Sequence, residues 1–80
     1  MGPKGKLWFD DDPSHCLELK VRDACKAYRH VFGEEADTVC VHPSVVEERT
    51  VIKSIVVVPR VWCLRHHYFA YKEEDERGTE

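Results

Sequence analysis

The sequence predicts a single small α/β domain, with α+β as the alternative class, in which one long helix packs on one face of a mixed sheet of about four strands. The chain has 80 residues, which fits one domain that buries roughly 60% of its unfolded surface. An amphipathic stretch of helical period occupies residues 13–32, and apolar or Val-rich stretches lie on both sides of it. We therefore expect the order strand, helix, strand, short helix, strand, strand in a globular domain of residues 1–72. A charged tail at residues 73–80 is expected to be disordered.

The long helix is predicted by the spacing of its apolar residues. They recur at intervals of four, three, four and three, which draws one stripe down a helix: Leu17, Val21, Ala24, Tyr28 and Val31. Asp12 and Pro13 are typical of a helix start, as N-cap and first helical residue. Gly33 is typical of a helix end, because it adopts the left-handed conformation readily. The apolar stripe should cover one face of a sheet.

One strand is predicted before this helix, at residues 6–10, and one after it, at residues 37–42. In the second strand, Val39 and Val41 can point to one face of the sheet while Cys40 and His42 point to the other. A strand, helix, strand unit of this length favours a right-handed crossover, which makes the two strands parallel. They are expected either as neighbours or with another strand between them.

The remaining elements follow Pro43, which ends the second strand. Ser44 and Glu47 match a capping box, which predicts a short helical turn to residue 49. Residues 50–58 form a nearly continuous Val- and Ile-rich run, which predicts a third strand. This strand could lie in the centre of the sheet, or at its edge, where it could pair with a partner chain. In residues 67–72, successive side chains would alternate between the two faces of a strand. This pattern predicts a final strand, antiparallel to the third.

Composition restricts the class of protein. The net charge of −3 gives no basic face of the kind that nucleic-acid binding requires. No segment approaches the ~20 apolar residues of a membrane span. The first residues lack the apolar segment of a signal peptide, so we expect a cytoplasmic protein with reduced cysteines. The chain has no Asn or Gln, and Met1 is its only methionine; this favours a thermophilic source, although four cysteines argue against one.

A group of cysteines and histidines is the first candidate site. Thiolates and imidazole nitrogens are the ligands that zinc prefers, and a metal can stabilise a domain this small. The candidate ligands are Cys40, His42, Cys63, His66 and His67. The alternative is that the two cysteines are small buried core residues and the histidines are ordinary partly exposed side chains.

Three further patterns have both a chemical and a structural interpretation. A cysteine beside one of these histidines could form a nucleophilic pair, but no family signature accompanies it. Asp10, Asp11 and Asp12 could hold Mg²⁺ at a strand end, or end the strand and cap the helix. Aromatic side chains could stack nucleic-acid bases. Because basic and acidic residues are interspersed along the chain, roles in the core or in a dimer contact suit these side chains better. They are Trp8, Phe9, Trp62, Tyr68, Phe69 and Tyr71.

Three segments together resemble small uncharacterised bacterial proteins of unknown function. They read Leu-Trp-Phe-Asp at residues 7–10, Tyr-Arg-His-Val-Phe-Gly at 28–33 and Val-Cys-Val-His-Pro-Ser at 39–44. The aromatic segment at residues 66–69 is similar to the final strand of such proteins. The resemblance implies a compact α/β fold and supplies no catalytic residue.

These observations lead to one expected function and two alternatives. The small size, the absence of a catalytic signature and the apolar third strand predict a non-enzymatic protein that binds a protein partner, first of all a second copy of itself, without a cofactor. The first alternative is a zinc-binding protein that uses the cysteine and histidine group. The weaker alternative is a regulator that binds nucleic acid.

Overall fold

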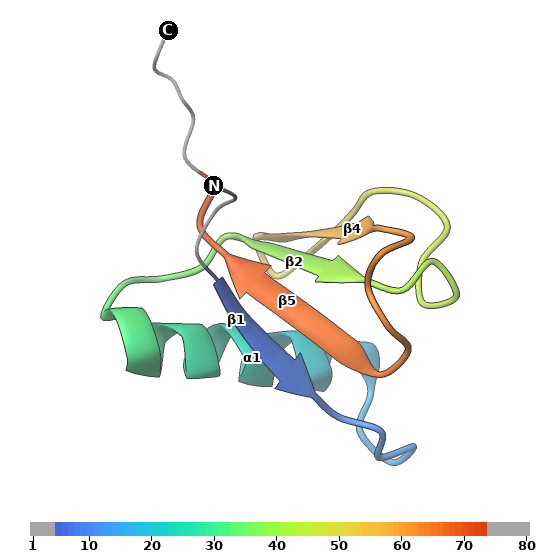
Figure 1. Cartoon of the computed structure of the whole chain (residues 1–80), viewed down its shortest axis with the longest axis horizontal. Coiled ribbons are helices and arrows are strands. Elements are labelled where there is room, and N and C mark those ends of the chain that lie inside the picture. The colour runs from blue at the N-terminus through green and yellow to red at the C-terminus, as the bar shows by residue number, and fades with distance from the viewer. Residues whose placement is uncertain (1–4, 74–80) are drawn as a thin grey trace, which may run out of the picture.

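The structure, a computed structural model, describes residues 5–73, which form one helix packed on one five-stranded sheet (Figure 1). The elements are β1 (Gly5–Phe9), α1 (Leu17–Phe32), β2 (Thr38–Val41), β3 (Thr50–Ile52), β4 (Ile55–Pro59) and β5 (His67–Tyr71). The strand order is β1-β5-β2-β4-β3; β2 and β4 are parallel, and the other neighbours are antiparallel. The prediction of a small mixed α/β fold is confirmed. Apart from Glu73, the predicted tail lies outside the described residues.

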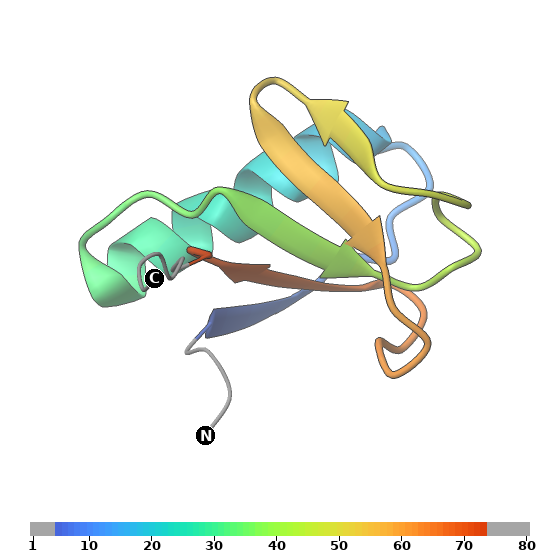
Figure 2. The same cartoon turned by 90° about the horizontal axis from the view of Figure 1, so that it is seen from above.

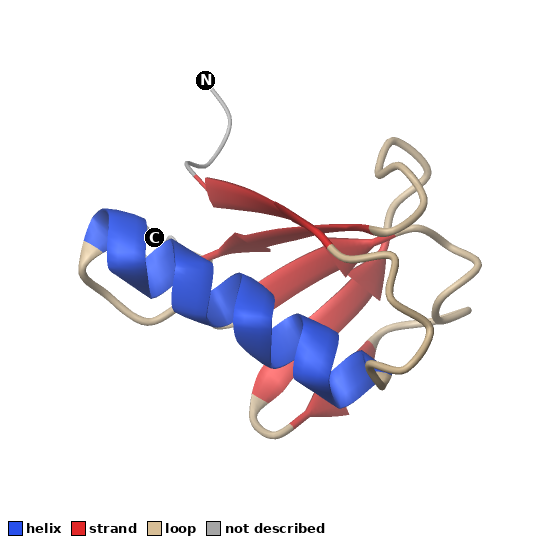
Figure 3. Cartoon of the chain, turned by 90° about the horizontal axis from the view of Figure 1, so that it is seen from below, coloured by secondary structure: helices blue, strands red, loops and turns tan. Residues whose placement is uncertain are grey.

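Helix α1 lies on one face of the sheet, and no second layer formed by residues 5–73 covers the other face (Figures 2 and 3). The core forms between α1 and this face. Its buried members include Val21, Ala24 and Tyr28 of the helix, and Val39 and Val41 of the sheet. The inward direction of the two β2 valines is therefore confirmed, and so is the predicted apolar stripe except at Val31, which is 54% exposed and lies outside the core. Within residues 5–73, no helix is long and apolar enough to cross a membrane.

The two ends of α1 follow from local hydrogen bonds. The helix begins at Leu17 rather than at residue 13, because Asp12 Oδ1 accepts hydrogen bonds from the Ser14 N–H at 2.9 Å and the Ser14 hydroxyl at 2.7 Å. These bonds hold residues 12–14 in a turn. The predicted end at Gly33 is confirmed: this residue has φ 75° and donates its N–H to the Arg29 carbonyl at 2.8 Å.

The third predicted strand is in fact a hairpin. Ile52 pairs with Ile55 across a two-residue turn, so residues 50–58 divide into β3 and β4 and the sheet has five strands rather than four. The turn residues Lys53 and Ser54 both have positive φ, at 51° and 71°. This is the geometry that two-residue hairpins need, but Lys and Ser rarely adopt it, so the sequence carried no turn signal.

The predicted short helix after β2 is absent, and residues 42–45 form a turn. The Val45 N–H donates to the His42 carbonyl at 2.9 Å. The Ser44 hydroxyl lies 2.8 Å from His42 Nδ1, which makes it unavailable to cap a helix. The capping-box pattern was therefore misleading here, because the serine bonds backwards to an imidazole.

The final strand runs antiparallel to β4, as predicted, but it is not a neighbour of β4. β5 pairs with β1 and β2, not with the third strand, and lies between the two parallel strands of the crossover. The connection between β4 and β5 passes on the side of the sheet away from α1 (Figure 2). Cys63 on this connection donates its thiol hydrogen to the Cys40 carbonyl at 3.5 Å. β5 is thus a central strand of the sheet, paired with β1 on one edge and with β2 on the other.

Candidate functional site

The main candidate surface is the face of the sheet opposite to α1. In β5 the residues alternate: Tyr68 and Ala70 are buried toward the helix, whereas His67, Phe69 and Tyr71 point to the other side. Register places Leu7 beside Phe69 and Phe9 beside His67 on that same side. Trp62, from the β4–β5 connection, packs edge-on against Phe69 with ring centroids 5.9 Å apart. We call this surface the aromatic face: Leu7, Phe9, Trp62, His67, Phe69 and Tyr71.

The aromatic face is strongly exposed for such side chains. Leu7 is 52% exposed, Phe9 54% and Trp62 58%. Ring contacts join its members, with centroids 5.0 Å apart between Phe9 and His67 and 5.8 Å apart between Phe69 and Tyr71. None of its members is Asp, Glu, Lys or Arg. A cluster of large apolar side chains without charge is typical of a contact surface rather than of a solvated one.

The two cysteines of the predicted zinc site lie close together, but the contact joins the Cys63 thiol to the backbone carbonyl of Cys40. The Cys63 thiol lies 3.5 Å from the Cys40 carbonyl and 3.3 Å from the His67 carbonyl. Both cysteines are buried, and burial raises the pKa of each thiol. An activated nucleophile needs the opposite shift, so the nucleophilic interpretation gains no support from these thiols.

The three histidines of that prediction point to separate partners. His42 Nδ1 accepts a hydrogen bond from the Ser44 N–H at 3.0 Å. His67 Nδ1 donates to the Arg65 carbonyl at 2.9 Å, and His66 is exposed beside the ring of Phe9. Among residues 5–73, no three Cys, His, Asp or Glu side chains are placed to hold a metal ion. Zinc binding stays a prediction, which elemental analysis of untagged protein would test.

The acidic run after β1 forms a hydrogen-bonded turn instead of a helix cap. Asp10 accepts the Asp12 N–H at 3.0 Å and lies 2.9 Å from the ring nitrogen Nδ1 of His15. The bond from His15 lowers the pKa of Asp10, and in return Asp10 raises the pKa of the imidazole. The helix cap itself is Cys16, which makes no side-chain capping bond. These carboxylates therefore order the β1–α1 loop, and the cap that the sequence suggested is wrong.

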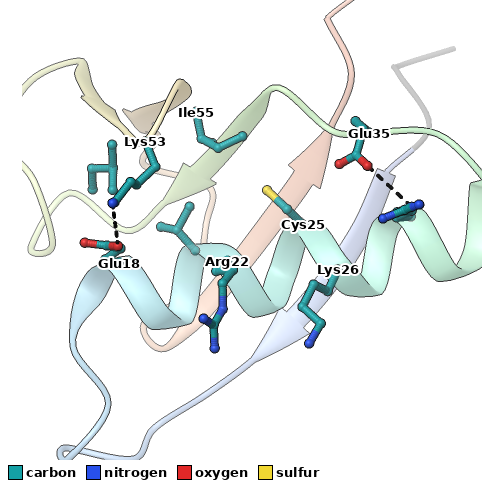
Figure 4. A pocket seen from close by; sticks show the side chains of 10 residues that line it. Glu18, Arg22, Cys25, Lys26, Glu35, Lys53 and Ile55 are labelled. Carbon is teal, nitrogen blue, oxygen red and sulfur yellow. Dashed lines mark ion pairs between the residues drawn. The ribbon is translucent and has the colours of Figure 1, made fainter.

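A groove of about 230 Å³ opens between α1 and the β3–β4 hairpin (Figure 4). Cys25 extends from the helix toward the hairpin, whereas Arg22 and Lys26 extend away from it. Burial raises the pKa of the Cys25 thiol to about 11, so it stays protonated at neutral pH. Two ion pairs lie at the rim: Glu18 with Lys53 at 3.8 Å, and Arg29 with Glu35 at 3.4 Å. The groove is an apolar recess with two ion pairs at its rim.

No protein-family model, curated protein or solved structure matches the chain. The six aromatic residues that the sequence analysis treats as one group lie in two places in the structure. Trp8 and Tyr68 pack in or against the core, whereas Phe9, Trp62 and Phe69 lie on the aromatic face. Tyr71 contacts the Phe69 ring on that face and also packs against the core. The alternation in residues 67–71 was the available signal for this division.

Proposed function

We propose that the protein is a non-enzymatic module that associates with a second copy of itself through the aromatic face. The observation that carries this proposal is the exposure of Leu7, Phe9 and Trp62. Each is more than half exposed, on the side of the sheet that no second layer from the described part of the chain covers. Antiparallel sheets that face water normally carry polar residues on that side. Large apolar residues at these positions favour a protein partner.

A second copy suits this surface better than a nucleic acid does. A phosphate backbone needs Lys and Arg around its aromatic platforms, and the aromatic face contains neither. The chain also has a net charge of −3. Two copies of an uncharged apolar surface can meet without charge complementarity, and a two-fold axis makes every contact twice.

The size of the domain gives a thermodynamic reason for this association. A chain of 80 residues has a modest core, and self-association adds to the apolar area that it removes from water. Full burial of a Leu or Phe side chain contributes about 1.5–3 kcal/mol. Leu7 and Phe9 are about half exposed, so each contributes roughly 1 kcal/mol per protomer when covered. A symmetric dimer doubles this contribution.

Sedimentation velocity over the micromolar to millimolar range tests the proposal. We expect a monomer–dimer equilibrium that Phe9→Lys weakens by about tenfold or more, because the substitution places two ammonium groups in an apolar contact. Val31→Lys is the matched control, since Val31 is also 54% exposed but lies on α1, away from this face. Circular dichroism confirms that both variants are folded. A wild-type protein that remains monomeric throughout, or equal weakening by the two variants, would refute self-association through this face.

A further inference from the structure

A polar pocket lies where the first turn of α1, the turn after β2 and the end of the β4–β5 connection come together. Its volume is about 260 Å³, and its lining includes Lys20, Ser44, Arg65, His66 and Tyr68. The parallel strands β1 and β2 both end on this side, and β5 starts between them. In sheets with helical crossovers, ligands bind beyond the carboxyl ends of such strands.

The charge of this pocket is positive. Lys20 and Arg65 line it from different elements, and neither makes an ion pair with any residue between 5 and 73. His66 adds an imidazole, whereas no carboxylate is part of the lining. The charge of Lys20 also reaches Asp10 and Asp12, but both carboxylates already accept hydrogen bonds in their own loop. Two unpaired cations thus face one polar cavity.

Tyr68 supplies an independent indication that this pocket holds a ligand. The residue is only 3% exposed, its side chain lines the pocket, and its hydroxyl makes no hydrogen bond within the described part of the chain. The hydroxyl oxygen is not sealed from solvent, so it is open to a ligand in the pocket. Burial raises the pKa of Tyr68, so its hydroxyl keeps its proton and can donate a hydrogen bond to an oxygen of a ligand.

The segment that carries Arg65 and His66 is held in place before any ligand arrives. The His66 carbonyl accepts the Asp10 N–H at 2.9 Å, and the Leu64 carbonyl accepts the His67 N–H at 3.2 Å. His66 itself has φ 67°, a left-handed conformation that a residue with a side chain rarely adopts. Surrounding contacts must maintain such a conformation, and strain of this kind is concentrated at ligand sites. The pocket is therefore preorganised.

We propose that this pocket binds the phosphate group of a small ligand, as inorganic phosphate or as a phosphomonoester. Lys20 and Arg65 neutralise the two negative charges, since both side chains are common phosphate ligands. Tyr68 donates a neutral hydrogen bond to a third oxygen. Ser44 forms part of the wall, because its hydroxyl is engaged with His42. The site is separate from the aromatic face and does not depend on self-association.

Titration of the full chain with sodium phosphate at constant ionic strength, followed by ¹H–¹⁵N NMR, tests this inference. We expect saturable shifts confined to the first turn of α1, to residues 44–45 and to residues 64–68, with weaker or absent shifts from sodium chloride. Lys20→Met combined with Arg65→Met should raise the dissociation constant about tenfold or more. Tyr68→Phe should raise it severalfold, because the ring remains and only the donor is lost.

Lys26→Met is the matched control, because Lys26 is an exposed lysine on the same helix that does not line this pocket. It should leave phosphate binding unchanged. Glycerol phosphate as a second titrant separates the two sources: tighter binding than inorganic phosphate identifies a phosphomonoester, and equal binding identifies the free ion. Equal loss of binding in Lys26→Met, shifts spread over the whole surface, or the same response to chloride would overturn the site.

Discussion

The turn between β3 and β4 offers a stability prediction that can be worked out from backbone angles. Lys53 and Ser54 have φ of 51° and 71°, the left-handed conformation that both positions of a type I′ hairpin turn require. An L-residue other than Gly or Asn is about 1–2 kcal/mol less stable in this conformation. Replacement by the preferred pair, Lys53→Asn with Ser54→Gly, should therefore relieve strain at both positions.

Two opposing effects limit the gain. Lys53 Nζ lies 3.8 Å from Glu18 Oε2, but the two side chains are 74% and 55% exposed, so this ion pair contributes at most about 1 kcal/mol. A glycine also gives the unfolded chain more freedom, which costs about 0.4–1 kcal/mol. The relief at two positions exceeds both losses, and the net stabilisation is about 1 kcal/mol. For a domain of this size, that raises the melting temperature by about 4–8 °C.

Thermal unfolding followed by circular dichroism, at one fixed protein concentration, checks this result for each single variant and for the pair. Glu18→Gln is the control, because it removes the ion pair and leaves the turn unchanged. Ser54→Gly should be the more stabilising single substitution, since it sacrifices no ion pair. A melting temperature for Ser54→Gly at or below that of the wild type would refute the argument that the left-handed turn stores strain.

Three further predictions concern other local features. Gly5→Ala should destabilise the domain by about 1–3 kcal/mol in urea unfolding, because the added Cβ would meet the Phe69 ring and lie 2.7 Å from a carbonyl oxygen of β5; unchanged stability would contradict this packing. His15→Gln should lower the melting temperature most between pH 3.8 and 6.5. The raised pKa of His15 stabilises the fold below pH 6.5, and this stabilisation is lost as the pH rises further. The lowered pKa of Asp10 stabilises the fold above pH 3.8, and this stabilisation is lost as the pH falls further. A constant difference at all pH values would exclude this pair as the cause. In a thiol assay at pH 8, only Cys16 should react quickly, because the other three cysteines are partly or fully buried with raised thiol pKa values; two or more fast thiols would be inconsistent with this burial.

Local patterns in the sequence were sufficient to predict the helix and the inward direction of β2. The stripe that includes Val21 and Tyr28 and the stop at Gly33 depend only on residues close together in the chain. Propensity failed at Lys53 and Ser54, because the hairpin imposes a conformation that neither residue favours. The capping box failed at Ser44, because the hydroxyl found His42 as a partner.

The sites were harder to predict, because each depends on residues that are distant in the chain. Lys20 and Arg65 line one pocket only because β5 lies between β1 and β2. No sequence spacing encodes that strand order. Trp8 and Trp62 show the same limit: the first packs against the core and the second is 58% exposed on the aromatic face. The residue type alone could not separate these two roles.

The alternation in β5 is the strongest reason to regard the aromatic face as covered in the working protein. On the helix side, Ala70 is fully buried beside Ala24 in the core, and these small residues let α1 lie close to the sheet. On the other side, Phe69 and Tyr71 are large, although the described residues form no second layer there. A one-residue slip of register would exchange these two sets, so the pattern fixes which side receives the helix. A sheet meant to face water needs no rings at positions 69 and 71, and threonine or lysine would serve there with less risk of aggregation. The large residues on the second side therefore support the proposal that a second copy of the chain packs there.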